Sequence, residues 1–338
     1  MTTTDPETAR ATARALIAGA RRVLVITHVN PDGDAVGSLL GFGLAARALG
    51  KDVVMACADV VPELFRFLPA VEEISLQPVG DFDLVVVVDV AEAKRMGAVG
   101  DGLLRQPDIV FDHHITNPGF GAVNFIDPLA ASTAELLTEL LEPLGLPLNL
   151  AVAECLLTGL VTDTLGFRTS NTTVKTLGLA QDLMRAGADL NRLYDLSLFK
   201  RSYGAIRLWG EGLCRLQMKN RIVWARLPLE ARQAAGYQGF GDADLINVLA
   251  SVREADIAII LVERSDGKVK ISWRAAPGIN VAGIALAFGG GGHPAAAGAE
   301  IAGTLDEVET LVLTATRAAL AAHKRATALV KAAADSPA

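Results

Sequence analysis

Between about residues 23 and 150, short apolar runs alternate with longer stretches in which apolar and polar residues recur at helical spacing. The short runs are rich in Val, Ile and Leu, a composition typical of strands that are buried on both faces of a parallel sheet. The runs are 23–27, 52–56, 84–89 and 109–112. Strands that alternate with helices, such as the one expected over 35–49, predict βαβ units. We therefore expect an α/β domain whose parallel sheet carries helices on both faces.

Helix boundaries can also be predicted in the first half of the chain. Residues from about Pro6 to Ala20 are Ala-rich and favour a helix. Ser132 and Glu135 have the spacing of a capping box, which places a helix start there. The apolar stretch 151–163 predicts a helix that ends at Asp163. Gly187, just beyond the helical pattern 173–185, suits a helix stop.

The pattern changes beyond about residue 187. A connecting helix is expected over 190–208, followed by short alternating strands that include 222–225 and 257–262. Ser265–Lys268 has the composition of a hairpin turn. We expect a catalytic domain over 1–188, a linker helix over 189–212, a smaller mixed α/β domain over 213–325 and a tail over 326–338.

Length, charge and cysteine content narrow the class of protein. A chain of 338 residues is long enough for two domains with separate cores. The net charge of −7 argues against binding to long duplex nucleic acid, although it permits a small anionic substrate. The three cysteines are far apart and predict no disulfide framework. No membrane span or secretory signal is apparent, so a cytoplasmic protein is expected.

Acidic and histidine residues gather where the predicted strands end. They are His28, Asp32 and Asp34 after the first run, Asp89 at the end of the third, Asp112, His113 and His114 at the end of the fourth, and Asp163 in the helix 151–163. Residues that bind ligands collect beyond the carboxyl ends of strands in open α/β sheets. Aspartate and histidine without cysteine suit a pair of divalent cations. The pattern favours a two-metal phosphoester hydrolase.

Each point has an alternative interpretation. The stretch from His28 to Asp34 is equally consistent with an Asx-rich turn that caps the following helix, and Asp89 could likewise cap a helix. A purely structural role is harder to find for His113 and His114, because two consecutive imidazoles at a strand end offer no clear advantage in packing. Asp163 places a negative charge at the negative end of a helix, which is unfavourable unless a cation lies nearby.

A glycine-rich segment in the second half is a second candidate site. Gly289–Gly292 precedes His293, and such a segment lets backbone N–H groups approach a phosphate closely. Arg274 and His293 could add side-chain donors. The alternative is a flexible hinge or a place where two backbones pack closely.

The chain resembles the DHH phosphoesterases, which carry a DHH domain followed by a DHHA1 domain. The four clusters of acidic and histidine residues and the Gly-Gly-Gly-His segment carry the resemblance, which covers roughly residues 15 to 325. The layout is most similar to the bacterial nano-RNase group. This resemblance implies hydrolysis of short oligoribonucleotides to mononucleotides and of adenosine 3′,5′-bisphosphate (pAp) to AMP. The chain is shorter than RecJ exonucleases and lacks the membrane segments of large cyclic-di-AMP phosphodiesterases.

The resemblance also implies a role for each site residue. His28, Asp32 and Asp89 would hold one metal. Asp34, Asp89, His113 and Asp163 would hold the other, so that Asp89 bridges the pair. Asp112 would orient a ligand imidazole, and His114 would face the scissile phosphate. The substrate would be held across a cleft by the second domain, through Arg274, Gly291, Gly292 and His293.

Mixed imidazole and carboxylate ligands favour two Mn²⁺ ions, with Mg²⁺ or another divalent cation left open. The expected substrates are short RNA oligonucleotides, pAp and the linear di-adenylate pApA. A cyclic or linear di-AMP phosphodiesterase is the main alternative. A family II-like pyrophosphatase is disfavoured because the second domain lacks its basic loop. A non-catalytic nucleotide-binding protein is disfavoured, because it would not require a bridging Asp89. The oligomeric state is left open between a monomer and a homodimer.

Overall fold

The computed structural model describes residues 5–239 and 241–334 of the chain. It divides into two compact units, Met1–Lys200 and Arg201–Ala338, and each unit has its own hydrophobic core. The division falls within the 189–212 segment that we expected to link two domains.

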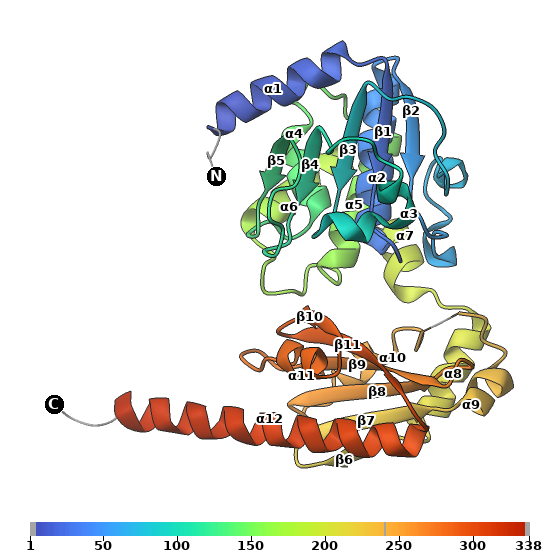
Figure 1. Cartoon of the computed structure of the whole chain (residues 1–338), viewed down its shortest axis with the longest axis vertical. Coiled ribbons are helices and arrows are strands. Elements are labelled where there is room, and N and C mark those ends of the chain that lie inside the picture. Colours follow the sequence, from blue (N-terminus) through green and yellow to red (C-terminus); the bar gives the residue numbers. More distant parts are fainter. Residues whose placement is uncertain (1–4, 240, 335–338) are drawn as a thin grey trace. The chain divides into compact units, whose positions relative to one another are not determined.

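The first unit is built on a five-stranded sheet in which every neighbouring pair is parallel (Figure 1). Its strands are β1 (Arg22–Ile26), β2 (Asp52–Ala56), β3 (Leu84–Val88), β4 (Ile109–Asp112) and β5 (Val123–Ile126). The first four confirm the predicted runs, whereas β5 was not predicted. The order is β2-β1-β3-β4-β5, so the chain winds in opposite directions from β1. This makes the carboxyl ends of β1 and β3 the switch point at which such sheets bind ligands.

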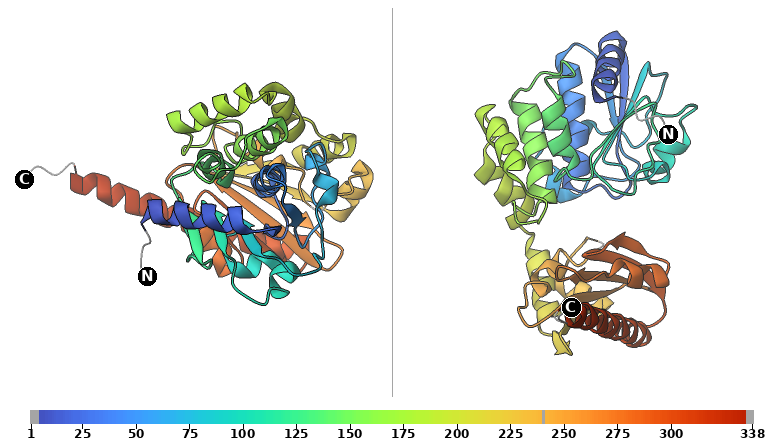
Figure 2. Two further views of the ribbon diagram at one scale, coloured as in Figure 1. Left: turned by 90° about the horizontal axis from the view of Figure 1, so that it is seen from above. Right: turned by 90° about the vertical axis from the view of Figure 1, so that its left-hand side faces the viewer.

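Helices cover both faces of this sheet, but unequally. On the larger face, α1 (Pro6–Gly19), α2 (Gly33–Ala48) and α4 (Thr133–Leu140) contact the strands. An outer layer of α5 (Leu150–Asp163), α6 (Val174–Arg185) and α7 (Leu190–Tyr194) packs on these helices. The smaller face is covered by η3 (Ala93–Met96) and α3 (Gly97–Asp101). In the right-hand view of Figure 2, α2 in blue and α5 in green run side by side. A Cβ on Gly37 would lie 2.5 Å from the carbonyl oxygen of Cys155, so glycine is required where these helices touch.

The second unit is a mixed six-stranded sheet in the order β10-β11-β9-β8-β7-β6. Its strands are β6 (Gln217–Lys219), β7 (Ile222–Leu227), β8 (Ile257–Glu263), β9 (Lys268–Ala275), β10 (Gly291–His293) and β11 (Ala296–Ala302). Only β7 and β8 pair in parallel. One face packs on α11 (Ala282–Ala287) and α12 (Leu305–Ala334), and the other packs on α8 (Tyr203–Leu213), α9 (Leu229–Ala235) and α10 (Leu245–Leu249). The expected mixed α/β architecture is confirmed.

Two segments differ from the expected elements. The 189–212 segment is not one helix, because η4 (Asp195–Phe199) follows α7 and Ser202 then caps a new helix by accepting from the N–H of Ala205. Residues 326–334, expected as a tail, continue α12, which is consistent with the high helix propensity of alanine. Residues 335–338 lie outside the described part of the chain. Among the described residues, no helix is long and apolar enough to cross a membrane.

Candidate metal centre

Side chains from four segments of the first unit meet at the carboxyl edge of its sheet. Residues following β1, β3 and β4 arrive there because all three strands are parallel. The loop after β1 leads into α2, and α5 ends at the same edge. Three overlapping groups have ligand atoms within 4.8 Å of one another: His28, Asp32 and Asp89; Asp34, His113 and Asp163; and Asp89, His113 and His114.

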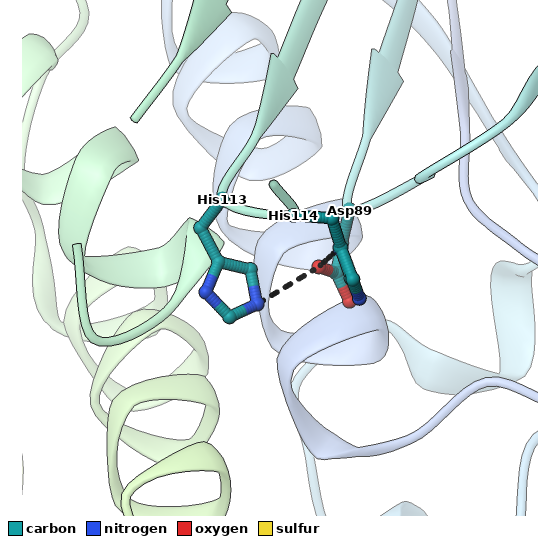
Figure 3. A group of neighbouring side chains, drawn as sticks. All are labelled: Asp89, His113 and His114. Atoms are coloured by element: carbon teal, nitrogen blue, oxygen red, sulfur yellow. Dashed lines mark ion pairs between the residues drawn. The ribbon is translucent and has the colours of Figure 1, made fainter. Parts of the chain in front are cut away.

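Asp89 lies between the groups and presents a different oxygen to each side. Its Oδ2 is 3.5 Å from Nε2 of His28, and its Oδ1 is 3.8 Å from Nε2 of His113 (Figure 3). The side chain is 2% exposed, and its backbone has a φ of 57°, a left-handed conformation in which aspartate is enriched. This is the geometry expected of a carboxylate shared by two cations.

Asp32 and Asp34 occupy the start of α2 in different environments. Asp32 caps the helix by accepting from the N–H groups of Asp34 and Ala35, so the capping interpretation and the ligand geometry both hold. Asp34 is buried, and its Oδ2 accepts from the N–H of Thr133 at 2.6 Å. Its Oδ1 accepts from the N–H of Ala134 at 2.9 Å, so α4 fixes both oxygens.

The charge of the cluster is unbalanced without cations. Burial raises the pKa of Asp34 well above its ordinary value, and the nearby charges of Asp89 and Asp163 raise it further. Burial and the charge of Asp89 raise the pKa of Asp163 in the same way. The four aspartates of the two ligand groups would together carry about four negative charges, which two divalent cations balance. The residues present therefore fit a pair of such ions.

The imidazoles are oriented to offer one ring nitrogen to the cluster. Nδ1 of His28 lies 2.8 Å from the carbonyl oxygen of Val29, while Nε2 faces Asp89. Nδ1 of His113 lies 3.4 Å from the carbonyl oxygen of Ala130, and its Nε2 is 3.5 Å from Oδ2 of Asp163. In both residues Nε2 is the nitrogen that faces the aspartates and could bind a metal, while Nδ1 lies near a backbone carbonyl. Nδ1 of His28 also lies 3.1 Å from a guanidinium nitrogen of Arg95.

Asp112 contacts His114 and not the imidazole that the resemblance implied as a ligand. Its Oδ1 is 2.8 Å from Nδ1 of His114, and its Oδ2 accepts from Nδ2 of Asn117 at 2.7 Å. Asp112 and His114 are two residues apart, a spacing at which side chains of an extended chain share a face. His113 also reaches the cluster, since its Nε2 and Nδ1 of His114 lie 3.8 and 3.7 Å from Oδ1 of Asp89. Burial lowers the pKa of His114, but hydrogen bonding to Asp112 and the charge of Asp89 outweigh it and raise the pKa to about 9.

Two contributors at this edge were missed at the level of sequence. Thr133 donates its hydroxyl to Oδ1 of Asp89 at 2.9 Å. Asn117 holds Asp112, and nothing in the sequence marked it. For Thr133 a signal existed, since the capping box was recognised, but it was interpreted only as a helix start. That start is confirmed, because Ser132 accepts from the N–H of Glu135.

In the second unit, the two predicted phosphate donors lie in one row across neighbouring strands. His293 on β10 is paired with Ala296 on β11, which is paired with Arg274 on β9. Paired residues face the same side of a sheet. Gly291 and Gly298 form the adjacent pair on that side, so only small residues lie between the imidazole and the guanidinium. The structure thus brings Arg274, Gly291 and His293 to one face.

Part of the glycine run has a structural reason. A Cβ on Gly290 or Gly292 would lie within 2.6 Å of backbone atoms of β11, so both positions require close packing of two backbones. Gly292 also has a φ of 140°. Gly291, in contrast, is exposed, and no atom lies within 4 Å of the position that its Cβ would take. Close packing therefore accounts for Gly290 and Gly292 but not for Gly291.

Known proteins match both units. Residues 22–160 match the N-terminal domain of the DHH family, and residues 242–321 match the DHHA1 domain. The bifunctional oligoribonuclease and PAP phosphatase NrnA of Thermus thermophilus is 37% identical over 301 residues, which cover 87% of this chain and 89% of that protein.

Two solved structures share the fold. One is an exopolyphosphatase-related protein from Bacteroides fragilis, with a TM-score of 0.87 and 24% identity over 96% of this chain and 99% of that chain. The other is RecJ of Thermus thermophilus in complex with Mn²⁺, with a TM-score of 0.52 and 17% identity over 95% of this chain and 55% of that chain.

Proposed function

The chain belongs to the DHH family and carries a DHHA1 domain, and from this premise we propose that it is a two-metal phosphoesterase acting on short RNA. Its substrates would be oligoribonucleotides of a few residues, hydrolysed to mononucleotides, and pAp, hydrolysed to AMP. The similarity to NrnA of Thermus thermophilus, named for both activities, supports this substrate class. We expect the protein to act in the cytoplasm.

The observation that carries the proposal is the pair of ligand groups joined through Asp89. His28, Asp32 and Asp89 would hold one Mn²⁺, while Asp34, Asp89, His113 and Asp163 would hold the other. When bound, two such cations lower the pKa of a shared water and stabilise the charge that develops on the phosphoryl group. A binding protein would gain nothing from a carboxylate that presents one oxygen to each of two groups.

The remaining residues supply orientation and proton transfer. Asp112 holds His114 through Nδ1, and this hydrogen bond raises the pKa of the imidazole and so favours its protonated form. His114 can therefore donate a proton or a hydrogen bond to the leaving ribose oxygen. Arg274, Gly291, Gly292 and His293 would bind a second phosphate of the substrate. Contacts that are restricted to phosphates leave the identity of the base poorly specified, as suits a degradative enzyme.

A product time course with purified protein and Mn²⁺ tests the proposal. The substrates are pAp, pApA, a labelled five-nucleotide RNA, cyclic di-AMP and pyrophosphate. We expect AMP from pAp and mononucleotides from the RNA, with slower turnover of the last two substrates. Preferred hydrolysis of cyclic di-AMP would assign the alternative phosphodiesterase activity, and preferred hydrolysis of pyrophosphate would overturn the proposal.

A further inference from the structure

The first turn of α4 donates hydrogen bonds to two aspartates that come from different segments of the chain. The hydroxyl of Thr133 donates to Oδ1 of Asp89 at 2.9 Å, and its backbone N–H donates to Oδ2 of Asp34 at 2.6 Å. The next N–H, of Ala134, donates to Oδ1 of Asp34. Thr133 is fully buried, and the two aspartates are 2% exposed or less. One residue thus contacts both the shared carboxylate and a ligand of the second group.

The α4 turn is itself held in place by buried polar contacts. The carboxylate of Glu135 is 1% exposed, and its Oε2 accepts from the N–H of Ala131 and from the hydroxyl of Thr176 at 2.7 Å. Its Oε1 pairs with Lys175 at 3.1 Å. Ser132 caps the helix through the N–H of Glu135. Because the turn is anchored on both sides, its donors cannot shift without breaking these bonds, and the turn forms a rigid template for the carboxylates.

The hydroxyl of Thr133 also fixes the orientation of the Asp89 carboxylate relative to the two ligand groups. Oδ1 of Asp89 is the oxygen on the side of His113, and Oδ2 is the one on the side of His28. A hydrogen bond to Oδ1 fixes the plane of the carboxylate, because rotation about the Cβ–Cγ bond would break it. Oδ1 then stays on the side of His113 and Oδ2 on the side of His28. Outer hydrogen bonds of this kind orient metal-binding carboxylates.

We propose that Thr133 is a positioning residue that sets the carboxylates of Asp89 and Asp34 for two cations. The inference rests on the proposed function and extends it to a residue that is not itself a ligand. Its hydroxyl, and not its volume, carries the effect. The backbone N–H groups that bind Asp34 remain in any variant. Substitution of Thr133 should therefore weaken metal binding only in part, through the loss of the hydrogen bond to Asp89.

A pair of substitutions separates the hydroxyl from the volume of the side chain. Thr133→Val keeps the shape but removes the donor, whereas Thr133→Ser keeps the donor. Thr158→Val is the matched control, since Thr158 is also fully buried in the first unit and its hydroxyl donates to the carbonyl oxygen of Glu154 within α5. Binding of Mn²⁺ to metal-stripped protein is measured by calorimetry, and melting temperatures are measured with EDTA and with Mn²⁺.

We expect Thr133→Val to bind Mn²⁺ about 10- to 100-fold more weakly than the unaltered protein. Its melting temperature should also rise less when Mn²⁺ is added. Thr133→Ser and Thr158→Val should bind like the unaltered protein. An unchanged affinity in Thr133→Val, or a melting temperature that falls equally with and without metal, would overturn the inference. If Thr133→Val does not fold, Thr133→Ala compared with Thr133→Ser decides in the same way. Failure of the unaltered protein to bind two equivalents would instead refute the proposed function.

Discussion

The Asp/His cluster of the first unit and the glycine hairpin of the second, formed by β10 and β11, differ in how the chain holds them. The cluster draws side chains from the ends of three strands and from two helices, and Asp34, Asp89 and His28 are nearly inaccessible to solvent. Residues 291–293 of the hairpin are exposed and belong to a single short strand. Buried side chains that are held by hydrogen bonds from several elements suit catalysis, which requires charges in fixed positions. An exposed strand suits binding of a flexible anionic substrate. Substitutions in the two regions should therefore differ in kind as well as in size.

The largest effect is expected from Asp89→Asn. An amide cannot supply two anionic oxygens, so both cations lose a shared ligand. We expect turnover of pAp to fall about a thousandfold or more, since metal stabilisation of the transition state amounts to several kcal/mol. Circular dichroism should show an intact fold. Asp127→Asn, which also lies just beyond a strand of this sheet but belongs to none of the three groups, should retain activity. Near-normal turnover of Asp89→Asn at saturating Mn²⁺ would disprove the two-metal assignment.

The next effect is expected from His114→Ala. If His114 donates a proton, kcat should fall by roughly 10²–10⁴-fold while both metals stay bound. The donor is lost when the imidazole deprotonates, so kcat of the unaltered enzyme should decline as the pH rises towards about 9, with bound cations moving the decline to lower pH. The variant should lack that decline. Metal analysis is decisive, because His114 also belongs to one of the three groups, and loss of one equivalent would make it a ligand.

The sequence was sufficient to predict the region that the backbone topology determines. Parallel strands with apolar runs end at one edge, so residues such as His28, Asp89 and His113 had to lie near one another once β1, β3 and β4 were recognised. The family resemblance supplied the division of ligands between two metals. That division remains a prediction, although the distances around Asp89 are consistent with it.

Contacts that depend on tertiary packing could not be predicted. The contact of Thr133 with Asp89 joins residues 44 positions apart, and no local pattern specifies it. The contact of Asp112 with His114 joins residues only two apart and could have been deduced from that spacing. β5 was missed because its residues, Val123–Ile126, are only partly buried and form a weak apolar signal. The break after η4 depends on Ser202 as a cap, within a stretch whose overall pattern is helical.

Effects in the hairpin region should be smaller and selective for substrate. Arg274→Ala and His293→Ala should mainly raise KM for pAp and short RNA, with a loss of roughly 10- to 150-fold in kcat/KM, as for a charge-assisted hydrogen bond. Bis-p-nitrophenyl phosphate has no second phosphate, so its hydrolysis should be unchanged. Equal damage to both substrates together with a lower melting temperature would favour a structural hinge and remove the phosphate-binding role.

The smallest expected effect is on thermal stability, and it should be seen in the first unit but not in the second. In metal-free protein the pKa values of Asp34, Asp163, His28 and His114 are all raised, so the folded first unit holds these protons more tightly than the unfolded chain does. Their contribution to stability is present at low pH and is lost as the pH rises through the folded pKa values. The lowered pKa of Asp89 acts in the opposite sense, but its contribution is already complete above the ordinary value of 3.8.

The gap in melting temperature between Mn²⁺-loaded and EDTA-treated protein should therefore widen from pH 5.5 to pH 8, by about 2–4 °C for each kcal/mol. Circular dichroism reports both units. Tryptophan fluorescence reports only the second, because the three tryptophans are Trp209, Trp224 and Trp273. We expect the fluorescence transition to show no gap between Mn²⁺ and EDTA at any pH. A gap that stays constant with pH would contradict the charge imbalance of the cluster, and a gap in the fluorescence transition would place metal binding, or its effect on stability, in the second unit as well.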